Sequence, residues 1–167
     1  MPPALFTGSG LGSRLAAREP DARYLRPNQN NGTLVDSCIL IDVLANDLQW
    51  ADWSITQLDA LGQQGPLVIN PIILAEISPR FETANDLEAA LAGLPLAREA
   101  LPWDAAFLAG QAFKIYRKTR GNKTSPMPDF YIGAHALVNN LQLLTRDAAR
   151  YQTYFPKLVV VGPVPHA

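Results

Sequence analysis

Short apolar runs alternate with helical patterns along most of this chain. Four runs, at residues 33–35, 67–69, 141–144 and 157–161, have the length and apolar character of buried strands. Strands separated by helices pair in parallel, because each helix carries the chain back across the sheet, and the helices then cover both faces. The sequence therefore predicts an α/β fold with a mainly parallel central sheet.

Apolar residues at helical spacing fill the stretches between these runs. The pattern predicts helices over residues 37–44, 50–61, 71–77, 84–91, 105–119, 130–139 and 148–155. Asp104 is a candidate N-cap of the longest of them, because a carboxylate in that position accepts a backbone hydrogen bond. Asp129 is expected to open the helix that follows.

Residues 1–32 differ from the rest of the chain. They are rich in Gly, Pro, Ser, Arg and Asn and lack apolar periodicity, which predicts a flexible N-terminal extension. Residues 33–165 then form a single globular domain. The extension carries Arg14, Arg18, Arg23 and Arg26. These arginines are able to touch a polyanion, but a solvated tail, or upstream sequence from an early start codon, is the favoured alternative.

Several features indicate a cytoplasmic protein that does not enter a membrane. No apolar stretch approaches the roughly 20 residues of a membrane span. The N-terminus also lacks the basic start and apolar segment of a signal peptide. Cys38 is the single cysteine and cannot form an internal disulfide, which fits a reducing compartment. With no histidine or second cysteine at ligand spacing, Cys38 is expected to be a small buried hydrophobe.

Four carboxylates lie where apolar runs meet turns or helices: Asp36, Glu76, Asp129 and Asp147. Asp36 and Asp147 follow strand runs, and Asp129 and Glu76 are expected near the N-terminal ends of helices, so all four reach one edge of the sheet. Carboxylates this close repel one another unless a cation neutralises them, and hard divalent cations prefer such oxygen ligands. The sequence therefore predicts a metal site.

Each acid also has an ordinary explanation when it is taken alone. Asp36 and Asp129 fit helix N-caps, Asp147 fits a turn residue, and Glu76 fits a paired acid of the core. For each residue alone these explanations are as good as a metal site, and the joint pattern favours the metal site.

The basic residues gather in one segment, although the net charge of the chain is only −1. Lys114, Arg117, Lys118, Arg120 and Lys123 have no acid among them, and Arg146 lies beside Asp147. We interpret these six residues as a ridge that contacts the phosphates of RNA. The alternative is a solvated helix face whose cations suit a helix C-terminus.

Two tryptophans and the two histidines are not expected to take part in RNA binding or catalysis. Trp50 and Trp53 fit the core or a partner interface better than base stacking, because they share helical spacing with apolar residues. Neither His135 nor His166 fits an acid–base role. His135 lies six residues after Asp129, which on a helix directs it away from that acid, and His166 lies at the end of the chain.

Four motifs occur in an order and spacing that resemble PIN-domain ribonucleases, in particular the VapC toxins of bacterial toxin–antitoxin modules. They are Thr-Leu-Val-Asp from residue 33, Asn-Pro-Ile-Ile-Leu-Ala-Glu from residue 70, Pro-Asp-Phe-Tyr-Ile-Gly-Ala-His-Ala from residue 128 and Leu-Thr-Arg-Asp from residue 144. In this resemblance Asp36, Glu76 and Asp129 match the invariant acids, and Asp147 matches a more variable fourth. Many relatives carry Asn or another small polar residue at the position of Cys38.

The resemblance implies a three-layer α/β/α PIN-like fold and endoribonuclease activity that depends on Mg²⁺ or Mn²⁺. It assigns the four acids to catalysis and metal binding, with RNA cleaved by a metal-activated water. It also implies homodimerisation and inhibition by a cognate, VapB-like antitoxin of a type II module. Two alternatives remain. One is an RNA-processing nuclease of the same fold without an antitoxin, and the other is a non-catalytic RNA- or protein-binding module.

Overall fold

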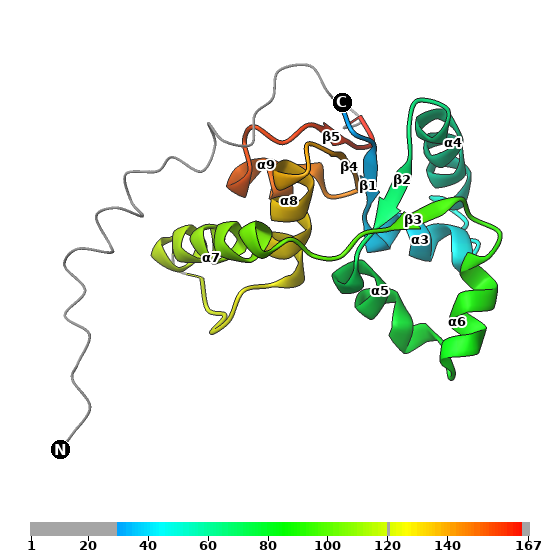
Figure 1. Ribbon diagram of the computed structural model, residues 1–167, viewed down its shortest axis with the longest axis horizontal. Helices are drawn as coiled ribbons and strands as arrows, with labels where there is room; N and C mark the ends of the chain where they lie inside the picture. The colour runs from blue at the N-terminus through cyan, green and yellow to red at the C-terminus, as the bar shows by residue number, and fades with distance from the viewer. Residues whose placement is uncertain (1–29, 120, 165–167) are drawn as a thin grey trace.

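A five-stranded, entirely parallel sheet lies at the centre of the protein, which we describe from a computed structural model for residues 30–119 and 121–164 (Figure 1). The strands are β1 (Thr33–Val35), β2 (Leu67–Ile69), β3 (Leu96–Arg98), β4 (Gln142–Leu144) and β5 (Val160–Val161). Their order across the sheet is β3-β2-β1-β4-β5, and every neighbouring pair is parallel. The predicted α/β fold with a parallel sheet is confirmed.

Helices make every connection between the strands. They are α3 (Ser37–Leu44), α4 (Ala51–Gly62), α5 (Pro71–Ile77), the 3-10 turn η1 (Ser78–Arg80), α6 (Ala84–Leu91), α7 (Trp103–Lys118), α8 (Pro128–Val138) and α9 (Ala148–Tyr154). Figure 1 shows α7, α8 and α9 on one side of the sheet and α3, α4 and α6 on the other. The sheet is thus the middle layer of three. Within residues 30–119 and 121–164, no helix is both long and apolar enough to cross a membrane.

The central strand β1 determines where a site can form. Leu34 and Val35 are fully buried, because helices cover both faces of the sheet and strands pair on both edges of β1. The chain runs from β1 outward to β2 and β3, and then returns to place β4 on the other side of β1. Strand order therefore reverses between β1 and β4, and ligands of such sheets bind beyond the carboxyl ends of the strands at this point.

Three details of the fold differ from the prediction. The last strand covers only residues 160–161 of the predicted run 157–161, because residues 157 and 158 lie in a turn and a bend. Strand β3 was not predicted, because its three residues lie at the sheet edge, are partly or fully exposed, and show no apolar run. The prediction that Asp104 is an N-cap was wrong: α7 has Pro102 as its N-cap, and Asp104 lies in the first turn. A carboxylate there still favours the helix N-terminus electrostatically.

Two residues just before β1 are hydrogen-bonded to the segment that leads into β4. The backbone N–H of Asn31 donates to the carbonyl of Asn140, and that of Gln142 donates to the carbonyl of Gly32. Gly32 has a φ of 134°, and a Cβ there would lie 2.5 Å from the carbonyl oxygen of Pro66, so only glycine fits. The extension's four arginines, together with Arg120 and His166, lie outside the described residues.

Gly133 allows α9 to approach α8. A Cβ at this position would lie 2.4 Å from Cε2 of Phe155 and 3.2 Å from Cδ1 of Tyr151. We expect Gly133→Ala to lower the free energy of unfolding by about 1–3 kcal/mol, because the overpacked ring must move. Gly110→Ala in α7 is the matched control, because a Cβ there meets nothing within 4 Å. It should gain about 0.5–1 kcal/mol from helix propensity. Urea unfolding measures the free energy of unfolding of both variants. Equal changes in the two variants would contradict the close contact at Gly133.

Candidate functional site

Asp36 lies at the carboxyl end of the central strand and is the N-cap of α3. Its Oδ1 accepts the backbone N–H of Ser37 at 2.8 Å, and its Oδ2 accepts the hydroxyls of Thr145 at 2.6 Å and Tyr151 at 3.2 Å. The residue is only 5% exposed. Burial raises the pKa of Asp36, the hydrogen bond from Thr145 lowers it by less, and the nearby charge of Asp129 raises it again. Asp36 is therefore both a helix cap and a member of an acidic cluster.

Glu76 lies near the C-terminal end of α5, so the prediction that it lies near the N-terminal end of its helix was wrong. Burial raises the pKa of Glu76, the side chain of Ser37 lowers it, and the charges of Asp36 and Asp129 raise it. Its Oε2 is buried and has no hydrogen-bond partner among the described residues. An unpaired buried oxygen costs free energy, and it is also a free ligand atom.

Asp129 is the second residue of α8, as expected for a residue near the N-terminal end of that helix, but the N-cap is Met127, so the alternative that Asp129 caps the helix was wrong. Its side chain is 19% exposed. Oδ2 of Asp129 pairs with Nη1 of Arg150 at 2.5 Å, and Oδ1 accepts a long hydrogen bond of 3.4 Å from the hydroxyl of Tyr151. Both carboxylate oxygens thus face donors from α9.

Asp147 lies at the rim of this cluster. It is the N-cap of α9, accepts the backbone N–H of Arg150 at 3.4 Å, and pairs with Nε of the same arginine at 3.2 Å. Its side chain is 53% exposed. The electrostatic influences that raise the pKa values of Asp36 and Glu76 include Asp129 and not Asp147. The structure thus brings three of the predicted acids together and leaves the fourth at the edge.

Three residues of the cluster were not found from the sequence: Thr145, Arg150 and Tyr151. Tyr151 is almost fully buried, and burial, followed by the charges of Asp36 and Asp129, raises its pKa well above the usual value. Its hydroxyl therefore stays protonated and acts as a donor. The sequence spacing could have indicated two of these three residues. Arg150 and Tyr151 lie three and four residues after Asp147, and residues at this spacing share one face of a helix.

Cys38 takes part in the polar contacts beside Asp36. Its Sγ lies 3.6 Å from Oδ2 of Asp36 and 3.7 Å from Oγ1 of Thr145, and it accepts the backbone N–H of Arg146 at 3.5 Å. Burial, followed by the charge of Asp36, raises the pKa of the Cys38 thiol to about 11. The prediction of a purely hydrophobic role was therefore incomplete, because the protonated thiol is a weak donor to Asp36.

A buried polar network connects the helices that carry Glu76 and Asp129. Oδ1 of Asn70, the N-cap of α5, accepts the backbone N–H of Ile73, so its amide nitrogen is the group that faces Nδ1 of His135 at 3.0 Å. His135 belongs to α8, and its Nε2 lies 3.1 Å from Glu99. Burial lowers the pKa of His135. A neutral ring protonated on Nε2 satisfies both contacts.

The basic residues of α7 are exposed at its C-terminal end. Lys114, Arg117 and Lys118 are all in the last turns, and Lys123 is exposed in the loop that follows. Arg117 donates from Nη1 to the carbonyl oxygens of Gly121 at 3.4 Å and Lys123 at 2.8 Å. Because α7 packs against α8, which carries Asp129, this cationic end lies on the layer that contributes to the acidic cluster.

Arg146 differs from the other basic residues, because a buried acid already balances its charge. Its Nε lies 3.0 Å from Oδ2 of Asp42, and its guanidinium lies over the ring of Trp50, 5.3 Å from the centroid. Asp42 is buried and also accepts the hydroxyl of Ser54 at 2.8 Å. Trp50 and Trp53 pack edge to face at 5.9 Å. This arrangement gives Arg146 a role in packing.

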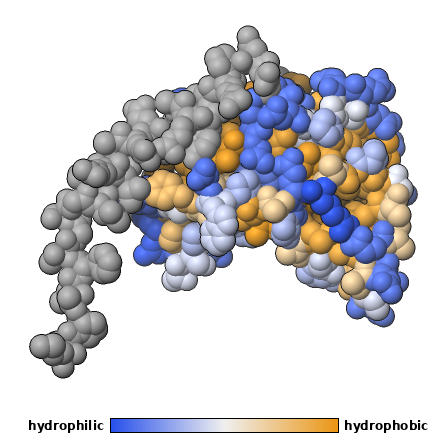
Figure 2. Space-filling view, viewed as in Figure 1, coloured by the Kyte–Doolittle hydropathy of each residue, from blue (hydrophilic) through white to orange (hydrophobic). Residues whose placement is uncertain are grey.

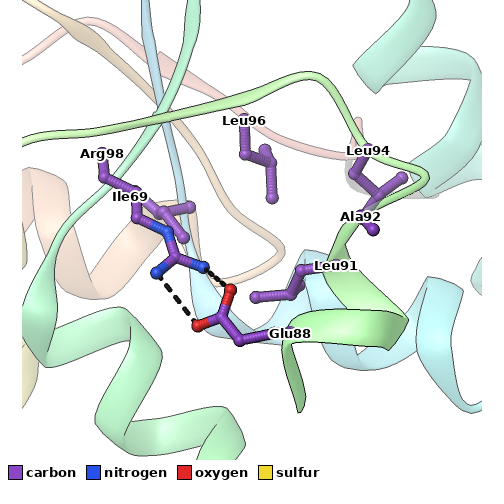
Figure 3. Close-up of a pocket in the computed structure, with 7 residues that line it drawn as sticks. All are labelled: Ile69, Glu88, Leu91, Ala92, Leu94, Leu96 and Arg98. Carbon is purple, nitrogen blue, oxygen red and sulfur yellow. Dashed lines mark hydrogen bonds and ion pairs between the residues drawn. The ribbon is translucent and has the colours of Figure 1, made fainter. Parts of the chain in front are cut away.

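A separate pocket lies between α6, β2 and β3 (Figure 3). Its two charged residues, Glu88 and Arg98, form a two-pronged ion pair with each other, at 3.0 and 2.7 Å. The rest of the lining consists of Ile69, Leu91, Ala92, Leu94 and Leu96. Figure 2 shows hydrophobic surface mixed with hydrophilic patches on this side of the molecule. None of the predicted catalytic or RNA-binding residues lines the pocket.

The acidic cluster fits a hard divalent cation by its chemistry. It offers carboxylate oxygens from Asp36, Glu76 and Asp129, and Oε2 of Glu76 lacks a partner among the described residues. Burial and the charges of neighbouring acids raise the pKa values of Asp36 and Glu76. Across residues 30–119 and 121–164, no three acidic, histidine or cysteine side chains stand in a geometry that would hold a metal as they are. One oxygen of Asp129 is paired with Arg150.

The raised pKa of Glu76 predicts how stability depends on pH without a cation. Because the folded protein binds this proton more tightly than the unfolded chain, stability falls as the pH rises from the ordinary carboxyl pKa, about 4, through the raised folded-state value. Glu76→Gln removes the effect. In EDTA, we expect the variant to gain stability relative to the natural protein as the pH rises above about 4. Denaturant unfolding at each pH measures this, and parallel profiles would contradict it.

Comparisons with known proteins agree with this fold. The family model of the PIN domain matches residues 33–156. Among solved structures, VapBC2 from Rickettsia felis bound to a promoter DNA fragment is 16% identical with a TM-score of 0.62, and the match covers 78% of this chain and 97% of that one. DNA-bound VapBC from Salmonella typhimurium is 18% identical with a TM-score of 0.58 and the same coverage.

A toxin–antitoxin complex from Klebsiella pneumoniae is 21% identical with a TM-score of 0.55, and the match covers 80% of this chain and 98% of that one. Identities this low establish likeness of fold only. No curated protein was found to match the chain.

Proposed function

This chain belongs to the PIN domain family, and we propose that it is a metal-dependent endoribonuclease and the toxin of a type II toxin–antitoxin pair. The observation that carries the proposal is the cluster of the buried Asp36 with the partly buried Glu76 and Asp129 at the carboxyl ends of the central strands, with one unpaired carboxylate oxygen. A stable protein gains nothing from an unpaired buried carboxylate oxygen, whereas a site for a divalent cation requires one.

The residues of the cluster divide the work as follows. Asp36, Glu76 and Asp129 would hold Mg²⁺ or Mn²⁺, which when bound supplies an activated water and offsets charge on the phosphate. Thr145 and Tyr151 orient Asp36 by donating to its Oδ2. Asp147 positions α9 as its N-cap. Such partners of metal ligands determine ligand orientation and affinity.

The substrate would reach the cluster along the exposed cations of α7. Lys114 and Lys118 are the best probes, because Arg117 also holds the loop through Gly121 and Lys123. We expect replacement of both lysines with Ala to weaken RNA binding and to reduce the slope of log affinity against log salt by about 1.4, or about 0.7 for each phosphate contact. Fluorescence anisotropy with a labelled single-stranded RNA in EDTA measures this. Arg98→Ala is the control, and an unchanged slope in the double variant would reject the ridge.

The partner would be an antitoxin, because one of the structural neighbours is a toxin–antitoxin complex. Apolar side chains of α4 remain accessible beside Leu94 and Leu96, and Ile55 among them is exposed. This surface suits the apolar face of a partner helix. Homodimerisation, as in the resemblance to VapC toxins, completes the proposed assembly, and light scattering of the purified protein measures it.

The decisive test is cleavage of total RNA by the purified chain in Mg²⁺ or Mn²⁺, with EDTA as the negative control. Products should carry a 5′-phosphate and a 3′-hydroxyl, because water is the nucleophile. A 2′,3′-cyclic phosphate would overturn the mechanism, since it marks attack by the 2′-hydroxyl of the RNA. Toxicity on expression that a small neighbouring gene relieves would distinguish a toxin from an RNA-processing nuclease.

A further inference from the structure

The guanidinium of Arg150 lies between two of the four predicted acids. Its Nη1 lies 2.5 Å from Oδ2 of Asp129, and its Nε lies 3.2 Å from Oδ2 of Asp147. The hydrogen bond that Arg150 donates to Asp129 is the first cause of the raised pKa of Arg150, followed by the charge of that same acid. Arg150 is nevertheless 52% exposed, so solvent and ions reach this pair.

The contact uses an oxygen that a cation would need. Asp129 has two carboxylate oxygens, of which Oδ2 faces Arg150 and Oδ1 faces the hydroxyl of Tyr151. In the same cluster, Oε2 of Glu76 has no partner among the described residues. Both carboxylate oxygens of Asp129 therefore already have partners, whereas Oε2 of Glu76 has none among the described residues.

We propose that Arg150 is a built-in competitor of the divalent cation: it neutralises Asp129 until an ion displaces it. The inference rests on the proposed function, because it assumes a cation at Asp36, Glu76 and Asp129. When the cation displaces Nη1 of Arg150 from Asp129, the side chain does not have to leave the site. Its Nε remains paired with Asp147, and Asp147 still caps α9. In this proposal the exposed acid Asp147 keeps its ion pair with Arg150 whether or not the cation is bound.

The pair between Arg150 and Asp129 also reduces the repulsion within the acidic cluster. Three carboxylates that repel one another would destabilise the fold, and a guanidinium on one of them offsets part of this cost. The same pairing must lower the affinity for the cation, because breaking it takes free energy from binding. An exposed arginine–carboxylate pair of this kind is expected to lower the affinity for the cation roughly fivefold.

The first experiment compares Mn²⁺ binding to three proteins by calorimetry without RNA. Arg150→Ala should bind Mn²⁺ roughly fivefold more tightly than the natural chain. Arg98→Ala should not differ from it, because Arg98 is 50% exposed and paired with Glu88 in the pocket of Figure 3, outside the acidic cluster. Binding by Arg150→Ala that is equal to or weaker than that of the natural chain would overturn the proposal.

The second experiment separates displacement from a general loss of positive charge. In an NMR titration with Mg²⁺, the Nη–Hη signals of Arg150, assigned by their absence in Arg150→Lys, should shift together with the amide signal of Ser37, because Nη1 is the group that leaves Asp129 and the amide of Ser37 donates to Asp36. A shift at Ser37 with Arg150 unmoved would reject the proposal and leave the metal site standing. If Mn²⁺ does not bind and neither signal moves, the proposed function itself fails, and this inference with it.

Discussion

Replacing Asp36 with Asn is expected to reduce RNA cleavage by at least about a hundredfold and to leave the fold as stable as before, or more stable. Losing even an outer partner of a metal ligand costs up to about a hundredfold in activity, so the loss of a direct ligand should cost no less. Stability behaves differently, because burial and Asp129 raise the pKa of Asp36 and the folded protein disfavours its charge. Asparagine removes that charge and still caps the helix.

Two measurements on the same preparation check this prediction. The cleavage rate of a defined RNA is compared in Mn²⁺, and the free energy of unfolding is compared by denaturant titration in EDTA. Equal cleavage by the variant would remove Asp36 from the catalytic set. A large loss of stability would show that its carboxylate serves the fold through Ser37, Thr145 and Tyr151 rather than a cation.

Replacing Asn70 with Ala is expected to lower the free energy of unfolding by about 2–4 kcal/mol. The variant loses the N-cap of α5, which is worth about 1 kcal/mol, and it leaves Nδ1 of the buried His135 without its partner, which costs about 1–3 kcal/mol more. Cleavage should fall as well, because this contact joins α5, which carries Glu76, to α8, which carries Asp129.

Thr83→Ala is the matched control for this variant. Thr83 caps the exposed N-terminus of α6 by accepting the backbone N–H of Asp86 at 3.1 Å, and it contacts no residue of the acidic cluster that the structure describes. It should cost about 1 kcal/mol and leave cleavage unchanged. If both variants lose the same stability, the contact between Asn70 and His135 contributes nothing beyond the cap.

The elements predicted correctly from the sequence are those whose local pattern and tertiary environment agree. The run at residues 67–69 is a strand in the prediction and in the structure, because a strand covered on both faces is apolar throughout. Residues 84–91 form a helix in both, since Thr83 caps it and Leu87 and Leu91 bury one face. Strand β3 shows the opposite case, because its edge position requires no apolar pattern.

The acids of the candidate site were named from the sequence, but their partners were not. Asp36 and Asp147 follow strands, and that position is visible in a linear pattern. Arg150 and Tyr151 look like ordinary helix residues until α9 is packed against α8, where Tyr151 reaches Asp36 and Asp129. Asn70 likewise looks like a simple cap until His135 lies beside its amide.

The sequence by itself determined the parallel α/β architecture and which carboxylates follow its central strands, because both depend on local patterns of burial and turns. Only the tertiary structure decided which charges meet. It buried Asp36, left Oε2 of Glu76 unpaired and placed Arg150 on Asp129. It also paired Arg146, one of the six predicted RNA-binding residues, with the buried Asp42. The physical reason is that electrostatic partners are chosen by distance through space, which the order of residues along the chain does not specify.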